Sequence, residues 1–416
     1  MAPSKMDRGC RHFAPTIFAA AFAVVAAASC GTSNSQNGPS ADAGPEGSSS
    51  GNSGSSRGSS SSSGGSSSSS SGSSGDAAAP QDAAPLPDAA IVCSESMAEC
   101  ADGGCATPHS CAPSDAGSTG CGPSQESCCT SLEVPCGAYY RTYTNDGSGA
   151  TGEANPAAIS GFRLDKYLVT VGRFRQFLTA WNGGSGYTPL AGSGKHTHLN
   201  GGNGLANSGT QGSYETGWLA SYNSNVVPTN QNLITCNAQY TTWTVAPGSQ
   251  ETFPMNCVNW YEAYAFCIWD GGFLPSEAEF EYASAGGNQQ REYPWGSKSP
   301  GTANQYAIYG CNYGSDAGNC TGVTNIAPVG TAALGAGLWG QLDLVGNLFE
   351  WNLDVSVPYV DPCTDCAYLP GTAGPVIRGG DFQSAAAPNL VSSYRNEGIY
   401  ATDREQANGF RCARTP

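Results

Sequence analysis

Charged side chains are scarce in this sequence, and basic ones are scarcer still. Only 12% of the 416 residues are charged, and 17 Lys and Arg stand against 33 Asp and Glu, a formal net charge of −16. Binding to nucleic acid or to an anionic membrane surface depends on clusters of Lys and Arg. We therefore expect no nucleic-acid partner.

Long apolar runs are also lacking, apart from one near the start. Residues 14–28 are rich in Ala, Val and Phe and follow a positively charged segment. This run is too short for a membrane span and has the flanks of a signal peptide. It ends in Ala27-Ala28-Ser29-Cys30, which resembles the lipobox of bacterial lipoproteins, whose cysteine is acylated. The sequence predicts a signal peptide over 1–29 and a lipid anchor to the membrane at Cys30, with plain secretion after cleavage near Ser29 as the alternative.

Apolar bulk is nearly absent from residue 31 to about residue 88, where Ser, Gly, Ala and Pro dominate. Such a segment cannot bury enough surface to offset its conformational entropy, so we expect a disordered tether over 30–90. Gly31 is not acidic, whereas an acidic residue at this position signals inner-membrane retention in some bacteria. The expected location is the cell envelope, at the outer membrane, or the secreted fraction.

Cysteine, by contrast, is abundant, with 18 in the chain. Eight lie between Cys93 and Cys136 and eight between Cys236 and Cys412. Downstream of a signal peptide, an even and dense set indicates disulfides rather than zinc. The first eight predict a crosslinked module over 91–136, interpreted as a spacer rather than a binding knob, from which Cys128 and Cys129 can pair outward.

Residues 137–416 are expected to form the main domain, because aromatic residues become frequent there. Cap residues predict three helices, after Thr170, after Asn259 and after Ser276, and the last two are followed by Glu262 and Glu279 in the pattern of a capping box. Glu279 and its neighbour Glu277 are therefore interpreted as structural rather than catalytic. Residues 375–378 are expected to form a strand.

Seven separated motifs follow one another in a fixed order: FRLDKYLVT (162–170), PMNCVNWYEA (254–263), GGFLPSEAEFE (271–281), YPWG (293–296), DLVGNLFEW (343–351), RGGDF (378–382) and GFRC (409–412). This series resembles the formylglycine-generating enzyme, or sulfatase-modifying factor, family across about 280 residues. The resemblance implies a single α+β domain of C-type-lectin-like topology with little regular secondary structure.

The resemblance also implies a copper site, at which two cysteines after the Arg-Gly-Gly motif oxidise a substrate cysteine to formylglycine. Counted from that motif, the two positions fall at Ser384 and Asn389. Neither side chain offers the soft thiolate that copper(I) requires. We therefore expect no copper and no formylglycine generation by this route.

Calcium is the metal that we do expect. Asp343, Gly346, Leu348 and Glu350 combine two carboxylates and two carbonyls in a loop that a glycine allows to curl, which suits a hard cation. The resemblance implies calcium at these positions, and more loosely at a second loop with Asn304, Gln305 and Asp316. The alternative is that Asp343 and Glu350 only cap backbone amides.

Histidine is too rare for the three-histidine iron site of related domains, because only His196 and His198 fall in the main domain. We expect these two on a surface loop, although their spacing also suits one face of a strand. Cys363 and Cys366 form a Cys-x-x-Cys motif without a βαβ pattern, so a local disulfide or two separate disulfides are favoured over redox chemistry.

Aromatic residues in a segment rich in Asn, Gly and Ser suit contact with a glycan or a protein, although core packing is an equal alternative: Tyr214, Trp218, Tyr222, Tyr240 and Trp243. The function that we expect is a surface-binding or scaffold module. The first alternative is a family enzyme that uses another metal or residue set, with titratable groups gathered in one cleft near Ser384, Arg378 and Arg395. A weaker one is a modifier of exported sulfatases whose partner supplies the thiols.

Overall fold

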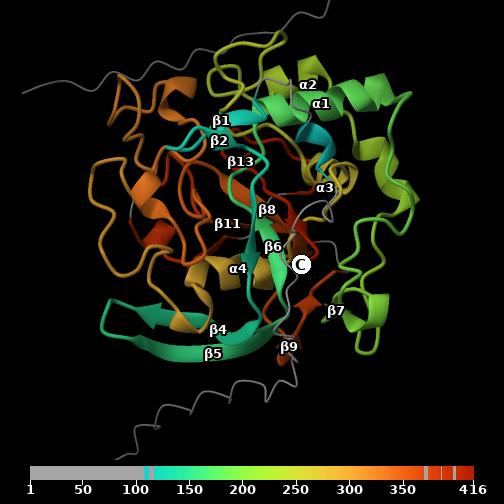
Figure 1. Ribbon diagram of the computed structural model, residues 1–416, viewed down its shortest axis with the longest axis vertical. Coiled ribbons are helices and arrows are strands. Elements are labelled where there is room, and N and C mark those ends of the chain that lie inside the picture. Colours follow the sequence, from blue (N-terminus) through green and yellow to red (C-terminus); the bar gives the residue numbers. More distant parts are fainter. Residues whose placement is uncertain (1–106, 112–116, 370–372, 386, 397–399) are drawn as a thin grey trace, which may run out of the picture. The chain divides into compact units, whose positions relative to one another are not determined.

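The computed structural model describes residues 107–111, 117–369, 373–385, 387–396 and 400–416 (Figure 1). These residues belong to one compact unit, 76–416. The predicted signal peptide, the lipid anchor at Cys30, the tether and positions 91–106 of the cysteine-rich module lie outside the described residues. In the part that is described, no helix is long and apolar enough to cross a membrane.

Regular structure is sparse and is divided among small sheets. The central sheet has the strand order β12-β11-β8-β13, in which β8 (Phe349–Val355) runs antiparallel to β11 (Pro375–Arg378) and parallel to β13 (Asn408–Gly409). Two three-stranded sheets have the orders β14-β6-β3 and β4-β5-β9. The remaining strand bounds are β1 Thr119–Cys121, β2 Glu126–Ser127, β3 Ser131–Val134, β4 Gly137–Asn145, β5 Ala150–Ile159, β6 Phe162–Asp165, β7 Ala206–Asn207, β9 Cys363–Thr364, β10 Cys366–Ala367, β12 Arg395–Asn396 and β14 Ala413–Arg414. The predicted α+β class with little regular structure is confirmed, as is the strand over 375–378.

The three predicted helices are present and begin at the expected caps. Helix α1 (Val171–Trp181) follows Thr170, whose hydroxyl accepts a hydrogen bond from the third amide of the helix. Helices α3 (Trp260–Trp269) and α4 (Glu277–Ala285) each begin with a complete capping box, formed by Asn259 and Ser276 with the glutamate three residues on. A short helix, α2 (Asn230–Thr235), is an addition that the sequence analysis does not predict.

Aromatic side chains hold α1 and α3 together in the core. The ring of Phe174 lies 5.8 Å from that of Phe266 and 6.3 Å from that of Phe410, centroid to centroid. All three rings are fully buried. Arg173, also buried completely, ion-pairs with Asp165 and Asp270, so the core contains charge that is compensated at close range.

Disulfides crosslink the described residues, as expected. The pairs are Cys111–Cys129, Cys121–Cys128, Cys236–Cys257, Cys267–Cys412, Cys311–Cys320 and Cys363–Cys366. The local Cys363–Cys366 bridge is therefore confirmed. The expected outward pairing of Cys128 and Cys129 is wrong, because both bond to cysteines of their own module.

The described part of the cysteine-rich module packs against the main domain. Strand β3 pairs antiparallel with β6, and the Gly117 carbonyl accepts a hydrogen bond from the Thr170 hydroxyl at 2.6 Å. The His109 ring stacks on that of Trp269. These contacts join the module to the core of the domain, which a spacer does not require.

Candidate functional site

The two positions that the resemblance assigns to copper lie in the segment after β11. The Ser384 hydroxyl is buried and donates to Asp381 Oδ1 at 2.7 Å, while the Asp381 amide donates back to the same hydroxyl at 3.0 Å. Asn389 lies half-buried in a short 3-10 helix, Ala387–Leu390. Both side chains are polar, neutral and free of sulfur.

Thiolates are missing from the described residues altogether. All thirteen cysteines in the described part of the chain are in disulfides, and a disulfide sulfur does not titrate. Copper(I) needs a soft, deprotonated sulfur ligand. The residues present around Ser384 therefore do not fit a copper thiolate site.

The predicted calcium residues lie together at the start of β8. Gly346 has a φ of +80°, which lets the loop curl, and Asp343 also has a positive φ. Asp343 Oδ2 accepts from the Gly330 amide, and both Glu350 oxygens accept from Arg411 at 2.7 Å. Both carboxylates are buried. Glu350 is thus ion-paired with Arg411 and Asp343 holds a backbone amide; in the described part of the chain, no group of three or more His, Cys, Asp or Glu side chains is placed to hold a metal ion.

Residues of the second predicted calcium loop are more open. Gln305 and Asp316 are exposed and Asn304 is half-buried. The Gln305 carbonyl accepts from the Leu334 amide, and the Asp316 carboxylate accepts from the Thr321 hydroxyl at 3.1 Å. No shared ligand geometry joins the three.

His196 differs most from its prediction. It lies in a loop, as expected, but the expectation of a surface position is wrong, because its side chain is fully buried. One ring nitrogen faces Glu215 at 3.1 Å and the other faces Glu279 at 3.1 Å. Burial lowers the pKa of His196, but Glu279 and Glu215 outweigh burial and raise it to about 10.

His198 lies two residues after His196, but its pKa is shifted in the opposite direction. Burial lowers its pKa to about 4, and within the described residues neither ring nitrogen has a hydrogen-bond partner. Its ring stacks on Phe273 instead. One histidine is thus held as a cation and the other as a neutral ring.

A second buried charge cluster surrounds Arg378. This guanidinium is fully buried and contacts Glu277 at 2.6 Å and Glu281 at 2.8 Å, and Arg395 binds the same Glu277. Burial raises the pKa of Glu281 to about 8. Arg378 and Arg395 therefore meet, but the contacts of Ser384 lie elsewhere, with Asp381. Glu277 forms ion pairs with both arginines, and Glu279 completes the capping box of α4 and faces His196.

Aromatic residues of the predicted contact segment divide between core and surface. Trp218, Tyr240 and Trp243 are buried, whereas Tyr214 is 40% exposed. Tyr222 is half-buried and borders a cleft of about 290 Å³. Of the residues that line this cleft, only Tyr222 is among the five aromatic residues predicted to contact a ligand.

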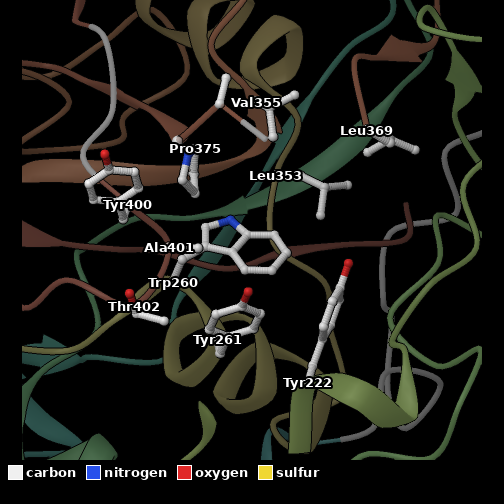
Figure 2. A pocket seen from close by; sticks show the side chains of 12 residues that line it. Tyr222, Trp260, Tyr261, Leu353, Val355, Leu369, Pro375, Tyr400, Ala401 and Thr402 are labelled. Carbon is white, nitrogen blue, oxygen red and sulfur yellow. The ribbon is translucent and has the colours of Figure 1, made fainter. Parts of the chain in front are cut away.

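The cleft joins five separate segments of the chain. Its lining comes from the 3-10 helix Ala220–Asn225, from the start of α3, from β8, from residues at and before the start of β11, and from the segment that begins at residue 400. The residues are Tyr222, Trp260, Tyr261, Leu353, Val355, Leu369, Ala373, Gly374, Pro375, Tyr400, Ala401 and Thr402. Figure 2 shows Trp260 in the middle, with Tyr400 on one side and Tyr222 on the other. The Trp260 indole is anchored by a hydrogen bond to the Asn352 carbonyl at 2.8 Å.

A family model and individual relatives point to the same protein family. Residues 120–416 match the model of the sulfatase-modifying factor enzyme 1-like domain. The formylglycine-generating enzyme of Streptomyces coelicolor is 33% identical over 168 residues, which cover 38% of this chain and 52% of that protein. The inactive C-alpha-formylglycine-generating enzyme 2 of Bos taurus is 30% identical over 161 residues, 39% of this chain and 50% of that protein. The chain thus spans about half the length of these two relatives.

Among solved structures, PvdO from Pseudomonas aeruginosa aligns with a TM-score of 0.44 and 20% identity, over 69% of this chain and 94% of that one.

Proposed function

The chain belongs to the sulfatase-modifying factor enzyme 1-like domain family, and on that premise we propose that it is a ligand-binding member that does not generate formylglycine through copper. The observation that carries the proposal is the state of the sulfur atoms. All thirteen described cysteines are in disulfides, and Ser384 and Asn389 stand where the resemblance places the copper ligands. A relative whose name declares it inactive is in keeping with such a loss.

The aromatic cleft supports a binding role. Aromatic side chains from three segments line it: Tyr400 is 71% exposed, Tyr222 and Tyr261 are half-buried, and Trp260 is buried. Exposed aromatic surface of this kind is typical of sites that contact a partner. The rigid anchor of Trp260 on the Asn352 carbonyl keeps the floor of the cleft in place.

Calcium is proposed as a structural ion at Asp343, Gly346, Leu348 and Glu350. There it would balance the two buried carboxylates and fix the loop before β8, which carries Leu353 and Val355 of the cleft. Its role would be to stabilise the fold rather than to take part in chemistry.

Export and a lipid anchor at Cys30 complete the proposal. Six disulfides between described cysteines are what an oxidising compartment produces. A tether between an acylated Cys30 and the domain would leave the cleft free to meet a surface glycan or protein.

The alternative is a family enzyme that acts by another route. The cluster of Arg378, Glu277 and Glu281 favours it, because buried titratable groups with shifted pKa values are common at active sites. A metal near His196 is harder to accommodate, since both of its ring nitrogens already face carboxylates.

A peptide containing Cys-x-Pro-x-Arg tests the proposal directly. Purified protein supplied with copper and oxygen should leave the peptide cysteine unchanged by mass spectrometry, with an active family enzyme as the positive control. Conversion of the cysteine to formylglycine would contradict the proposal. Metal analysis of the same sample should find calcium; stoichiometric iron would support the alternative enzyme instead.

A further inference from the structure

We infer that the aromatic cleft is a site for uncharged oligosaccharides. This inference rests on the proposed binding function and gives it a ligand class. Its basis is the chemistry of the twelve lining residues, which combine aromatic faces, small apolar groups and hydroxyls and include no charged side chain.

Ring faces supply the first element of sugar recognition. Tyr222, Trp260 and Tyr261 lie with centroids 5.1 to 5.9 Å apart and with their planes steeply inclined to one another. Trp260 is buried within this cluster, so the half-buried rings of Tyr222 and Tyr261 are the ones that can meet the C–H surface of a pyranose. Tyr400, opposite Tyr222 across Trp260, adds a further exposed ring (Figure 2).

Hydroxyl groups without partners supply the second element of sugar recognition. Within the described ranges, the phenol oxygens of Tyr222, Tyr261 and Tyr400 and the Thr402 hydroxyl have no hydrogen-bond partner. Each can both donate and accept, which matches the hydroxyls of a sugar. A purely apolar ligand would leave these groups without partners.

The lack of positive charge in the cleft supplies the third element, the preference for uncharged sugars. A chain with a formal net charge of −16 repels anions, and none of the twelve described lining residues is a Lys or Arg that would offset that repulsion. A sulfate or uronate would therefore find no cation among these residues, so the cleft favours neutral sugars.

Neutral hexasaccharides are the probes: maltohexaose, cellohexaose, laminarihexaose and chitohexaose, titrated into the domain by calorimetry or by NMR. We expect at least one to bind, with a heparin-derived hexasaccharide binding at least ~10-fold more weakly or not at all. Tyr261→Ala and Tyr400→Ala should each weaken the binding about tenfold, and Tyr→Phe at either position should weaken it less because the ring remains.

Tyr214→Ala is the matched control, because this tyrosine is also exposed but lies outside the cleft. It should leave the affinity unchanged. Because Tyr400 is on the surface, its alanine variant is expected to fold normally, which the melting temperature verifies.

Three outcomes would overturn the inference: binding to none of the neutral hexasaccharides at millimolar concentration, tighter binding to the sulfated one, or equal losses in Tyr214→Ala and the cleft variants. A proline-rich peptide that binds the cleft in place of the sugars would also overturn it while leaving the proposed binding function intact. Formylglycine formation in the peptide assay would instead remove the binding proposal itself.

Discussion

Replacing His196 by glutamine should destabilise the domain strongly, although the two side chains are similar in size. The imidazolium holds two buried carboxylates, those of Glu215 and Glu279, at 3.1 Å on either side. Glutamine keeps a hydrogen bond but removes the charge, which leaves negative charge buried without compensation. Breaking such a pair from one side costs about 3–5 kcal/mol. His198→Gln, two residues on, should cost about 1 kcal/mol or less, because no ion pair is lost.

Chemical denaturation at pH 7 with the disulfides intact measures both losses. His198→Gln is a matched control, because the two histidines lie in one loop and both contact the ring of Phe273. Equal losses in the two variants, or a loss below ~1 kcal/mol for His196→Gln, would refute the assignment of His196 as a buried cation.

Titration of the histidine ring signals by NMR tests the same assignment without denaturation. With a pKa of about 10, His196 should remain an imidazolium past pH 8, whereas His198, with a pKa of about 4, should remain neutral down to pH 5. The folded state therefore binds the His196 proton more tightly than the unfolded chain, whose histidine has a pKa near 6.5. This contribution to stability is complete below about pH 6.5 and is lost as the pH rises toward 10, by at most ~1.4 kcal/mol per pH unit.

Three further predictions concern stability. Removing the Cys267–Cys412 bridge, which closes a separation of 145 residues, should lower the free energy of unfolding by about 5 kcal/mol. Removing the Cys363–Cys366 bridge, with a separation of 3, should lower it by about 1.6 kcal/mol. Chemical denaturation of the paired Cys→Ala variants measures both losses, and a reversed order would contradict the chain-entropy reasoning. Arg378→Met should lower the free energy of unfolding by about 3–5 kcal/mol, because Arg378 pairs with buried carboxylates. Lys166→Met should lower it by less than ~1 kcal/mol, because the Lys166 ion pair is partly exposed. Similar losses in the two variants would argue against a buried network at Arg378. Chelation with EGTA should lower the melting temperature and added calcium should restore it, and an unchanged melting temperature would count against the structural calcium ion.

Local signals in the sequence predicted the helices well. The caps at Thr170, Asn259 and Ser276 act within one turn, so the residues that form them are neighbours in the chain. Ordered motifs predicted the family and the α+β class for the same reason, because each motif is a local pattern.

Contacts between segments that are distant in the sequence could not be predicted from local sequence patterns. His196 was placed on the surface because Gly and Ser surround it, but Glu279 from α4, 83 residues away, buries it. The cleft likewise combines Tyr222, Trp260 and Tyr400, which no spacing in the sequence relates. The ion pairs of Arg378 with Glu277 and Glu281 arise only once α4 packs on β11.

The most direct test of the central proposal is a count of copper(I) bound to the oxidised, purified domain in competition with a chromophoric chelator. We predict that the native protein takes up no copper(I) in this assay. Ser384→Cys combined with Asn389→Cys should gain affinity when the two introduced cysteines are kept reduced, because the pair then supplies two thiolates. Tight binding of about one copper(I) by the native protein would contradict the proposal, because it would require a thiolate site that the described cysteines, all in disulfides, do not provide.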